Sequence, residues 1–146
     1  MLRLRDVLVP GPADQREAPR FFGSEEPYPR LSERPDVLVF ETDPLTAPVE
    51  VTGPSEVHLW VSSSALDTDF TAKLIDVHPP NEDYPDGYDM LLVDSIARAR
   101  FRNGPDREAP MEPGEPVSLR IELPPISNLF APGHRIRLDV SSSNFP

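Results

Sequence analysis

The sequence lacks cysteine altogether and contains no long apolar run. Without cysteine the chain forms no disulfide, no thiolate metal site and no thiol nucleophile. This composition fits a reducing compartment, so we expect a cytoplasmic location. No segment approaches the roughly 18 consecutive apolar residues that a membrane-spanning helix needs. Residues 1–6 also lack the apolar core of a signal peptide. We therefore expect no membrane partner.

Positive charge is also scarce, because 14 lysines and arginines face 25 aspartates and glutamates and leave a net charge of −11. Binding to nucleic acid needs a positive surface, so we expect no nucleic-acid partner. The arginines recur at every second position, at Arg98, Arg100 and Arg102 and again at Arg135 and Arg137. This spacing places each group on one face of a strand, where its members either face solvent or pair with the surplus acids.

Signatures of catalysis and of cofactor binding are missing as well. None of the seven glycines belongs to the G-x-S-x-G turn that exposes a catalytic serine or to a glycine loop that holds phosphate. The three histidines, His58, His78 and His134, lie far apart in the sequence and lack H-x-x-x-H spacing. We therefore predict no catalytic residue, no cofactor and no metal.

Proline is abundant instead, with 20 residues gathered in clusters that separate strongly alternating segments. Proline is poorly tolerated inside helices and central strands, so these clusters predict turns. Between them apolar and polar residues alternate with a period of two, which places the apolar side chains on one face of a strand. The expected strands are 36–41, 48–52, 56–62, 69–77, 96–102, 117–123 and 135–141.

These short strands predict an all-β fold, an antiparallel sandwich that occupies residues 36–146. Residues 1–35 contain many prolines and charges but few alternating positions. We interpret this segment as an extended arm or linker.

Two acidic features permit more than one interpretation. Asp67 and Asp69 open an expected strand, and residues 81–89 form an acidic loop. Clustered carboxylates could bind calcium, but the loop lacks the spacing of an EF-hand. Aspartate, asparagine, proline and glycine are also common in turns. We expect a solvated hairpin loop, and we expect Asp67 and Asp69 to cap a turn or to pair with arginines of a strand.

Trp60 is the sole tryptophan, and it falls with His58 on the polar face of an expected strand. An outward aromatic side chain can form part of a domain interface or a platform for a sugar ring. Both interpretations stay open for Trp60 and His58.

Several strings, in this order and at this spacing, resemble the C-terminal domain of the X-Pro dipeptidyl-peptidase and cocaine esterase-like acyl hydrolases. The resemblance covers roughly residues 36–146. The strings are ETDPL at 41–45, VEVTGP at 49–54, DTDFTAKLIDV at 67–77, IARARFR at 96–102 and GHRIRLDVSSSNFP at 133–146.

The resemblance implies a jelly-roll, galactose-binding-like sandwich that follows an α/β-hydrolase domain. In such enzymes the Ser-Asp-His triad belongs to the hydrolase domain, and no triad position maps onto this chain. The chain would then be an inactive accessory domain. Its partner would be the α/β-hydrolase catalytic domain, in cis or in trans, and it would buttress both this domain and the oligomer.

The resemblance gives the matching residues structural roles. It implies a turn and ion pairs for Asp67 and Asp69 with the arginines that follow, a special backbone conformation for Gly133, and strand-end hydrogen bonds for 141–143. The residues so implicated are Asp67, Asp69, Arg98, Arg100, Gly133, His134 and Arg135.

The sequence ends where related domains continue through at least one more strand, so we expect an open sheet edge and a homo-oligomer that forms through it. Two other functions remain possible. One is a stand-alone carbohydrate-binding module with Trp60 and His58 as its platform. The other is an enzyme with a site among Asp67, His78 and His134.

Overall fold

The computed structural model describes residues 14–15 and 30–143. The described part of the chain folds into six β-strands and two short 3-10 turns, η3 (Leu31–Glu33) and η4 (Ala99–Phe101). The strands are β1 (Val37–Glu41), β2 (Val49–Val61), β3 (Asp69–His78), β4 (Tyr88–Arg98), β5 (Val117–Phe130) and β6 (Arg135–Ser141).

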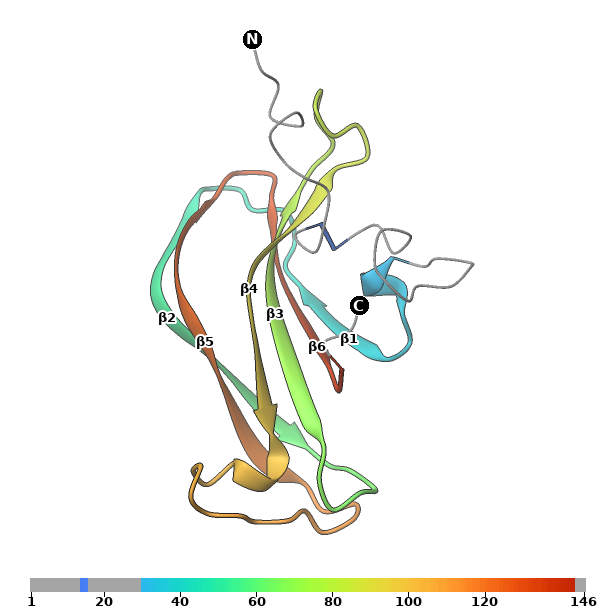
Figure 1. Cartoon of the computed structure of the whole chain (residues 1–146). Coiled ribbons are helices and arrows are strands. Elements are labelled where there is room, and N and C mark those ends of the chain that lie inside the picture. Colours follow the sequence, from blue (N-terminus) through green and yellow to red (C-terminus); the bar gives the residue numbers. More distant parts are fainter. Residues whose placement is uncertain (1–13, 16–29, 144–146) are drawn as a thin grey trace.

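The strands form two antiparallel sheets, as the alternating sequence pattern predicts. One sheet has the order β1-β6-β3-β4, and β2 pairs with β5 in the other. In Figure 1 the β2–β5 sheet lies beside β4 and β3, whereas β1 occupies the far side of the four-stranded sheet. The all-β antiparallel sandwich is therefore confirmed.

The core lies between the two sheets and is built from the apolar positions of the period-two pattern. In β5 the residues Leu119, Ile121 and Leu123 are buried while the residues between them are exposed. They pack with Val57 of β2 and Ala72 of β3. Burial of such side chains stabilises the fold by about 1.5–3 kcal/mol for each large aliphatic group.

The expected strands 48–52 and 56–62 are one continuous strand, β2, so the prediction of two strands was wrong. The pairing of β2 with β5 shifts in register between Gly53 and Ser55. Pro124 and Pro125, expected to end a strand, lie inside β5 opposite this shift. A proline cannot donate to a ladder, but it is tolerated at a bulge where the ladder is already interrupted.

The expected strand 96–102 is also wrong in its second half, because β4 ends at Arg98 and residues 99–101 form η4. Asp67 causes the change of direction by accepting hydrogen bonds from both the backbone nitrogen (3.0 Å) and Nε (2.6 Å) of Arg100. Arg102 donates to the carbonyl oxygens of residues 99 and 109. The three arginines of this segment therefore do not share one face of a strand.

The outer face of the four-stranded sheet carries a buried ion-pair network around Arg137 of β6. Nη1 of Arg137 lies 2.6 Å from Oδ2 of Asp89, and its Nε lies 3.1 Å from Oδ1 of Asp139. Burial raises the pKa of the Asp139 carboxyl, and Arg137 opposes this shift. The alternating arginines of β6 thus pair with surplus acids, and at position 137 they do so out of contact with solvent.

Residues 14 and 15 lie along the edge of β4, beside this network. Asp14 forms an isolated bridge with Met90 of β4, and the Gln15 nitrogen donates to the Asp89 carbonyl over 2.9 Å. Both residues are buried. Most of the expected arm lies outside the described residues, so its boundary at residue 35 stays a prediction.

Gly87 lets the two ends of the β3–β4 hairpin connection approach each other closely, and substitution of this glycine tests the approach. It has a φ of +82°, and a Cβ at this position would lie 2.7 Å from the carbonyl oxygen of His78. Gly114 has a similar φ of +83° with nothing within 4 Å of its Cβ position. Gly114→Ala should lower the free energy of unfolding by about 1–2 kcal/mol, for the backbone conformation alone.

Gly87→Ala should lower the free energy of unfolding by on the order of 3 kcal/mol or more, because the steric conflict with the His78 carbonyl adds to the backbone strain. Urea unfolding of the two variants and the parent chain measures the difference. Equal losses for the two variants would show that the hairpin does not approach His78 in this way.

Candidate functional site

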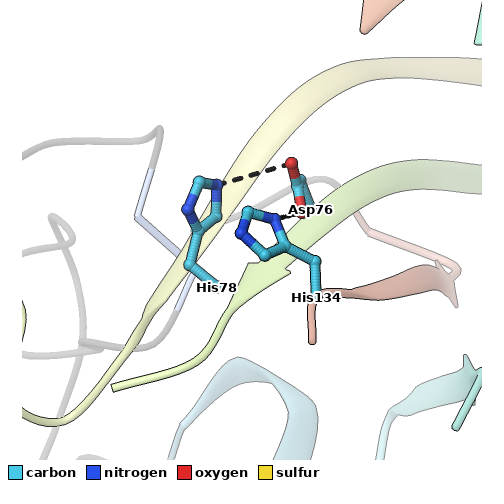
Figure 2. A group of neighbouring side chains, drawn as sticks. All are labelled: Asp76, His78 and His134. Carbon is cyan, nitrogen blue, oxygen red and sulfur yellow. Dashed lines mark hydrogen bonds and ion pairs between the residues drawn. The ribbon is translucent and has the colours of Figure 1, made fainter. Parts of the chain in front are cut away.

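Asp76, His78 and His134 converge at one end of the sandwich (Figure 2). Nδ1 of His134 lies 2.8 Å from Oδ1 of Asp76, and Nε2 of His78 lies 3.4 Å from Oδ2 of the same carboxyl group. The two imidazole rings have centroids 4.2 Å apart and are tilted by 44°. One carboxylate group therefore faces both imidazole rings, which lie against each other.

Three elements position this cluster. Asp76 and His78 are two residues apart on β3, so the pleat points both side chains to the same face. This is the inner face, since Asp76 pairs in register with Ile136 and accepts a hydrogen bond of 3.3 Å from Asn128 of the opposite sheet. His134 comes from the turn between β5 and β6.

Backbone hydrogen bonds hold the turn that carries His134. Gly133, with a φ of +84°, donates its nitrogen to the Leu45 carbonyl, and the Leu45 nitrogen donates to the His134 carbonyl, both over 2.8 Å. The His134 nitrogen closes the turn on the Ala131 carbonyl at 3.1 Å. The β1–β2 connection therefore fixes the position from which the imidazole of His134 reaches Asp76.

Asp76 is a buried charge that its neighbours stabilise. Burial raises the pKa of its carboxyl group, but the side chains of His78, His134 and Asn128 lower this pKa by a larger amount. The net result is a pKa below the usual range. Because an ionised carboxylate only accepts hydrogen bonds, Nδ1 of His134 acts as the donor. The cluster thus carries one negative charge when both histidines are neutral.

His78 has an incomplete set of partners. Its Nε2 is shielded from solvent and has no aligned hydrogen-bond partner among the described residues. The ring of Tyr88 stands edge-on at a centroid distance of 5.9 Å. Beside the imidazole lies a surface hollow lined also by Tyr84, Tyr88 and Met90. The side chains of His78 and His134 remain 27% and 17% exposed, so the cluster is open on one side.

Sequence spacing did not reveal this convergence, because His78 and His134 are far apart in the sequence but have neighbouring rings in the structure. Asp76 and His134 are 58 positions apart but meet because β6 pairs directly with β3. The signal that could have found them is local. Asp76 and His78 share one face at the end of an expected strand, and His134 directly precedes the strand that pairs with it.

The other residues implicated by the sequence lie elsewhere. At the opposite end of β3, Asp69 binds Arg98 through two hydrogen bonds of 2.8 and 2.9 Å. There Asp67 also accepts the bonds of Arg100 described above. The Arg98 guanidinium lowers the pKa of the Asp69 carboxyl through its hydrogen bonds. Arg135 donates to the Thr42 carbonyl at 2.9 Å.

The acidic loop is a hairpin connection, with one departure from expectation. The Asn81 side chain accepts hydrogen bonds from the backbone nitrogens of Asp83 and Tyr84, both at 2.9 Å. Tyr88 and Asp89 are not solvated, because they begin β4 and are buried.

Trp60 and His58 lie on the outer face of β2, away from the cluster. Trp60 is 79% exposed. Nε2 of His58 lies 3.0 Å from Oε2 of Glu56. The side chains of this surface pair with one another across the β2–β5 sheet, as Arg120 does with Glu56 at 3.4 Å.

In the described part of the chain no α-helix has the length and hydrophobicity needed to cross a membrane.

Comparisons with protein families and with individual proteins point to the same group of hydrolases. Residues 10–146 match the family described as the X-Pro dipeptidyl-peptidase C-terminal non-catalytic domain. The chain is 46% identical over 136 residues to a cocaine esterase of Rhodococcus sp. (strain MB1 Bresler), an alignment that covers 93% of this chain and 20% of the relative.

Two solved structures have a similar fold. An α-amino acid ester hydrolase superposes with a TM-score of 0.75 at 39% identity, over 80% of this chain and 19% of its own. An aminopeptidase from the marine sediment archaeon Thaumarchaeota archaeon superposes with a TM-score of 0.74 at 40% identity. The superposition covers 79% of this chain and 19% of the aminopeptidase. The chain therefore spans about one fifth of the length of these relatives.

The cluster predicts a specific loss of stability when its carboxylate is removed. Asp76→Ala leaves the donors of His134 and Asn128 without their acceptor inside the sandwich, which should lower the free energy of unfolding by about 3 kcal/mol. Glu82→Ala removes an exposed carboxylate from the neighbouring hairpin loop and should change stability by less than about 0.5 kcal/mol. Urea unfolding at pH 7 compares the two variants, and equal effects would contradict a structural role for Asp76.

Proposed function

This chain belongs to the X-Pro dipeptidyl-peptidase C-terminal non-catalytic domain family, and on this basis we propose that it docks onto the α/β-hydrolase catalytic part of a serine acyl hydrolase and stabilises it. The relatives support the proposal, since they carry about four fifths of their length outside the region matched here. In this proposal the chain alone has no hydrolase activity, and the serine, histidine and aspartate of the reaction belong to its partner.

An uncovered apolar surface on β1 carries the proposal. Leu38 pairs in register with Val140, and Phe40 pairs with Leu138. Paired residues in an antiparallel ladder share a face, and Leu138 packs against the core, so all four side chains lie on the inner face of the four-stranded sheet. Leu38 is nevertheless 62% exposed, and Phe40 is exposed as well.

The exposure follows from the unequal width of the two sheets. The two-stranded sheet lies against β4 and β3, so none of the described strands covers the inner face of β1 (Figure 1). Large apolar side chains grouped on one sheet face are typical of a contact surface. The occupant that we propose for this surface, called the β1 face, is the hydrolase part to which domains of this family are joined.

The exposed Trp60 favours a second candidate function. A tryptophan that is 79% exposed on a polar surface can stack against a sugar ring, with His58 beside it. In that case binding to a glycan array should be lost in Trp60→Ala and retained in Leu38→Ser. Failure of the parent chain to bind any glycan would remove this candidate.

A homo-oligomer through an open sheet edge and a cytoplasmic location also remain proposals. β1 and β4 are the outer strands of the larger sheet. Among the described residues, no strand pairs with the outer side of β1, and the outer side of β4 is bordered by the bridge of Asp14 with Met90. Such edges can recruit another strand. Sedimentation velocity over a wide concentration range tests the oligomer, and a monomer at the highest concentration would contradict it.

The β1 face predicts a difference between two matched leucine variants. Leu38 and Leu129 are 62% and 61% exposed, but Leu129 lies on the outer face of β5, paired with Glu50. We would graft this chain onto the Rhodococcus cocaine esterase in place of the matching region. In the graft, Leu38→Ser should lower thermal stability, by about 2 kcal/mol in free energy, and reduce hydrolysis of a p-nitrophenyl ester after heating. Leu129→Ser should change neither.

The same variants in the isolated chain serve as the control. Both should alter its free energy of unfolding by less than about 0.5 kcal/mol, because both leucines are exposed there. Equal behaviour of the two variants in the graft would contradict docking through the β1 face. Hydrolysis of the ester by the isolated chain would contradict the accessory role itself.

A further inference from the structure

We propose that Asp76, His78 and His134 form a binding site for a divalent transition metal, with Zn²⁺ as the ion that suits it best. The proposal rests on the geometry of the three side chains and is independent of the docking function. It adds a ligand to a domain for which the sequence alone predicts none.

The donor set matches the preference of zinc. Two imidazole nitrogens and one carboxylate oxygen make up a common protein ligand set for Zn²⁺, which leaves a fourth position for water. Calcium and magnesium prefer sites made only of oxygen, so two histidines argue against them.

The spacing of the donor atoms fits a single ion. In a tetrahedral site with bonds of about 2.0–2.1 Å, neighbouring donor atoms are separated by about 3.3 Å. Here the carboxylate oxygens of Asp76 lie 2.8 Å from Nδ1 of His134 and 3.4 Å from Nε2 of His78. The donor atoms of all three side chains lie within 4.8 Å of one another. Small side-chain rotations therefore bring them to one centre.

An unsatisfied atom points to the same conclusion. Nε2 of His78 is shielded from solvent without an aligned hydrogen-bond partner among the described residues, although it faces the Asp76 carboxylate. A buried polar atom without a partner costs about 1–3 kcal/mol. Coordination of a metal by this nitrogen would remove the cost. Coordination by Nδ1 of His134 leaves the ring proton on Nε2, a change of tautomer that needs no net proton release.

The surroundings of the cluster resemble those of a metal site. Asn128 donates to Oδ2 of Asp76 and can keep this bond while Oδ1 coordinates the ion, which orients the carboxylate. The backbone bonds of the turn at Gly133 fix the position of His134. The partial exposure of the two imidazoles leaves a path for the ion and room for a water ligand. A bound ion would join β3 to the β5–β6 turn.

Zinc titration of the full chain tests the proposal. We would titrate ZnCl₂ into protein freed of metal by a chelator, at pH 7, by isothermal calorimetry, and follow thermal unfolding with and without zinc. We expect one ion per chain and a zinc-dependent rise in the melting temperature. His78→Gln and His134→Gln should each weaken binding by on the order of 100-fold or more, because each removes a ligand, and Asn128→Ala by about 10–100-fold.

His58→Gln is the matched control, since His58 is a histidine paired with a carboxylate on the outer face of β2. It should leave the affinity for zinc unchanged. No saturable binding to the parent chain would overturn the proposal, and so would binding that survives in both His78→Gln and His134→Gln or that is lost in His58→Gln.

A second measurement decides the matter if a variant fails to fold. Co²⁺ added to the parent chain should give the visible absorption of a tetrahedral site. It should also shift the NMR resonances of the imidazole protons of His78 and His134 far from their usual positions. Paramagnetic shifts confined to His58, or to no histidine, would overturn the proposal.

Discussion

The buried carboxylate of Asp76 is the constraint on which this end of the sandwich depends. A charge removed from water needs hydrogen-bond donors, and here the donors come from β5 of the opposite sheet and from the β5–β6 turn, while His78 of β3 lies 3.4 Å away. Each donor fixes the element to which it belongs. The two sheets are therefore joined at this end through one polar group, whereas apolar side chains join them along the rest of their length.

A second buried charge lies on the other face of the same sheet. Arg137 pairs in register with Ile75, the residue beside Asp76, so the two charges are neighbours through the thickness of the sheet. Arg137 forms ion pairs with Asp89 and Asp139. Breaking such a pair costs more than the pair contributes, because the remaining ion stays buried. The pair of Arg137 with Asp89 thus links β6 to β4 across the intervening strand β3.

The sequence was sufficient for the fold class because the period of two is a local property. The alternation within a segment such as 117–123 predicts which face of the strand is buried and which is exposed, without reference to any other part of the chain. The errors arose where the backbone responded to distant partners. Residues 99–101 leave the strand because Asp67 binds the backbone of Arg100, and Pro124 fits inside β5 because β2 shifts its register opposite it. The cluster of Asp76, His78 and His134 escaped sequence reasoning for the same reason, since only the pairing of β3 with β6 brings it together.

Hydrogen bonds to β6 and to the turn before it connect the cluster of Asp76, His78 and His134 with the β1 face. Thr42, just beyond β1, donates its nitrogen to the Ile136 carbonyl at 3.0 Å and accepts the Ile136 nitrogen on its hydroxyl at 3.1 Å. Leu45 of the same connection makes the two backbone bonds that fix the turn of His134. Anything that orders His134 therefore also orders the segment that follows β1, while Phe40 is held by its register with Leu138. Because a contact surface binds more tightly when its backbone is already ordered, a ligand at Asp76 and a partner on the β1 face should each favour the binding of the other, as reciprocal coupling requires.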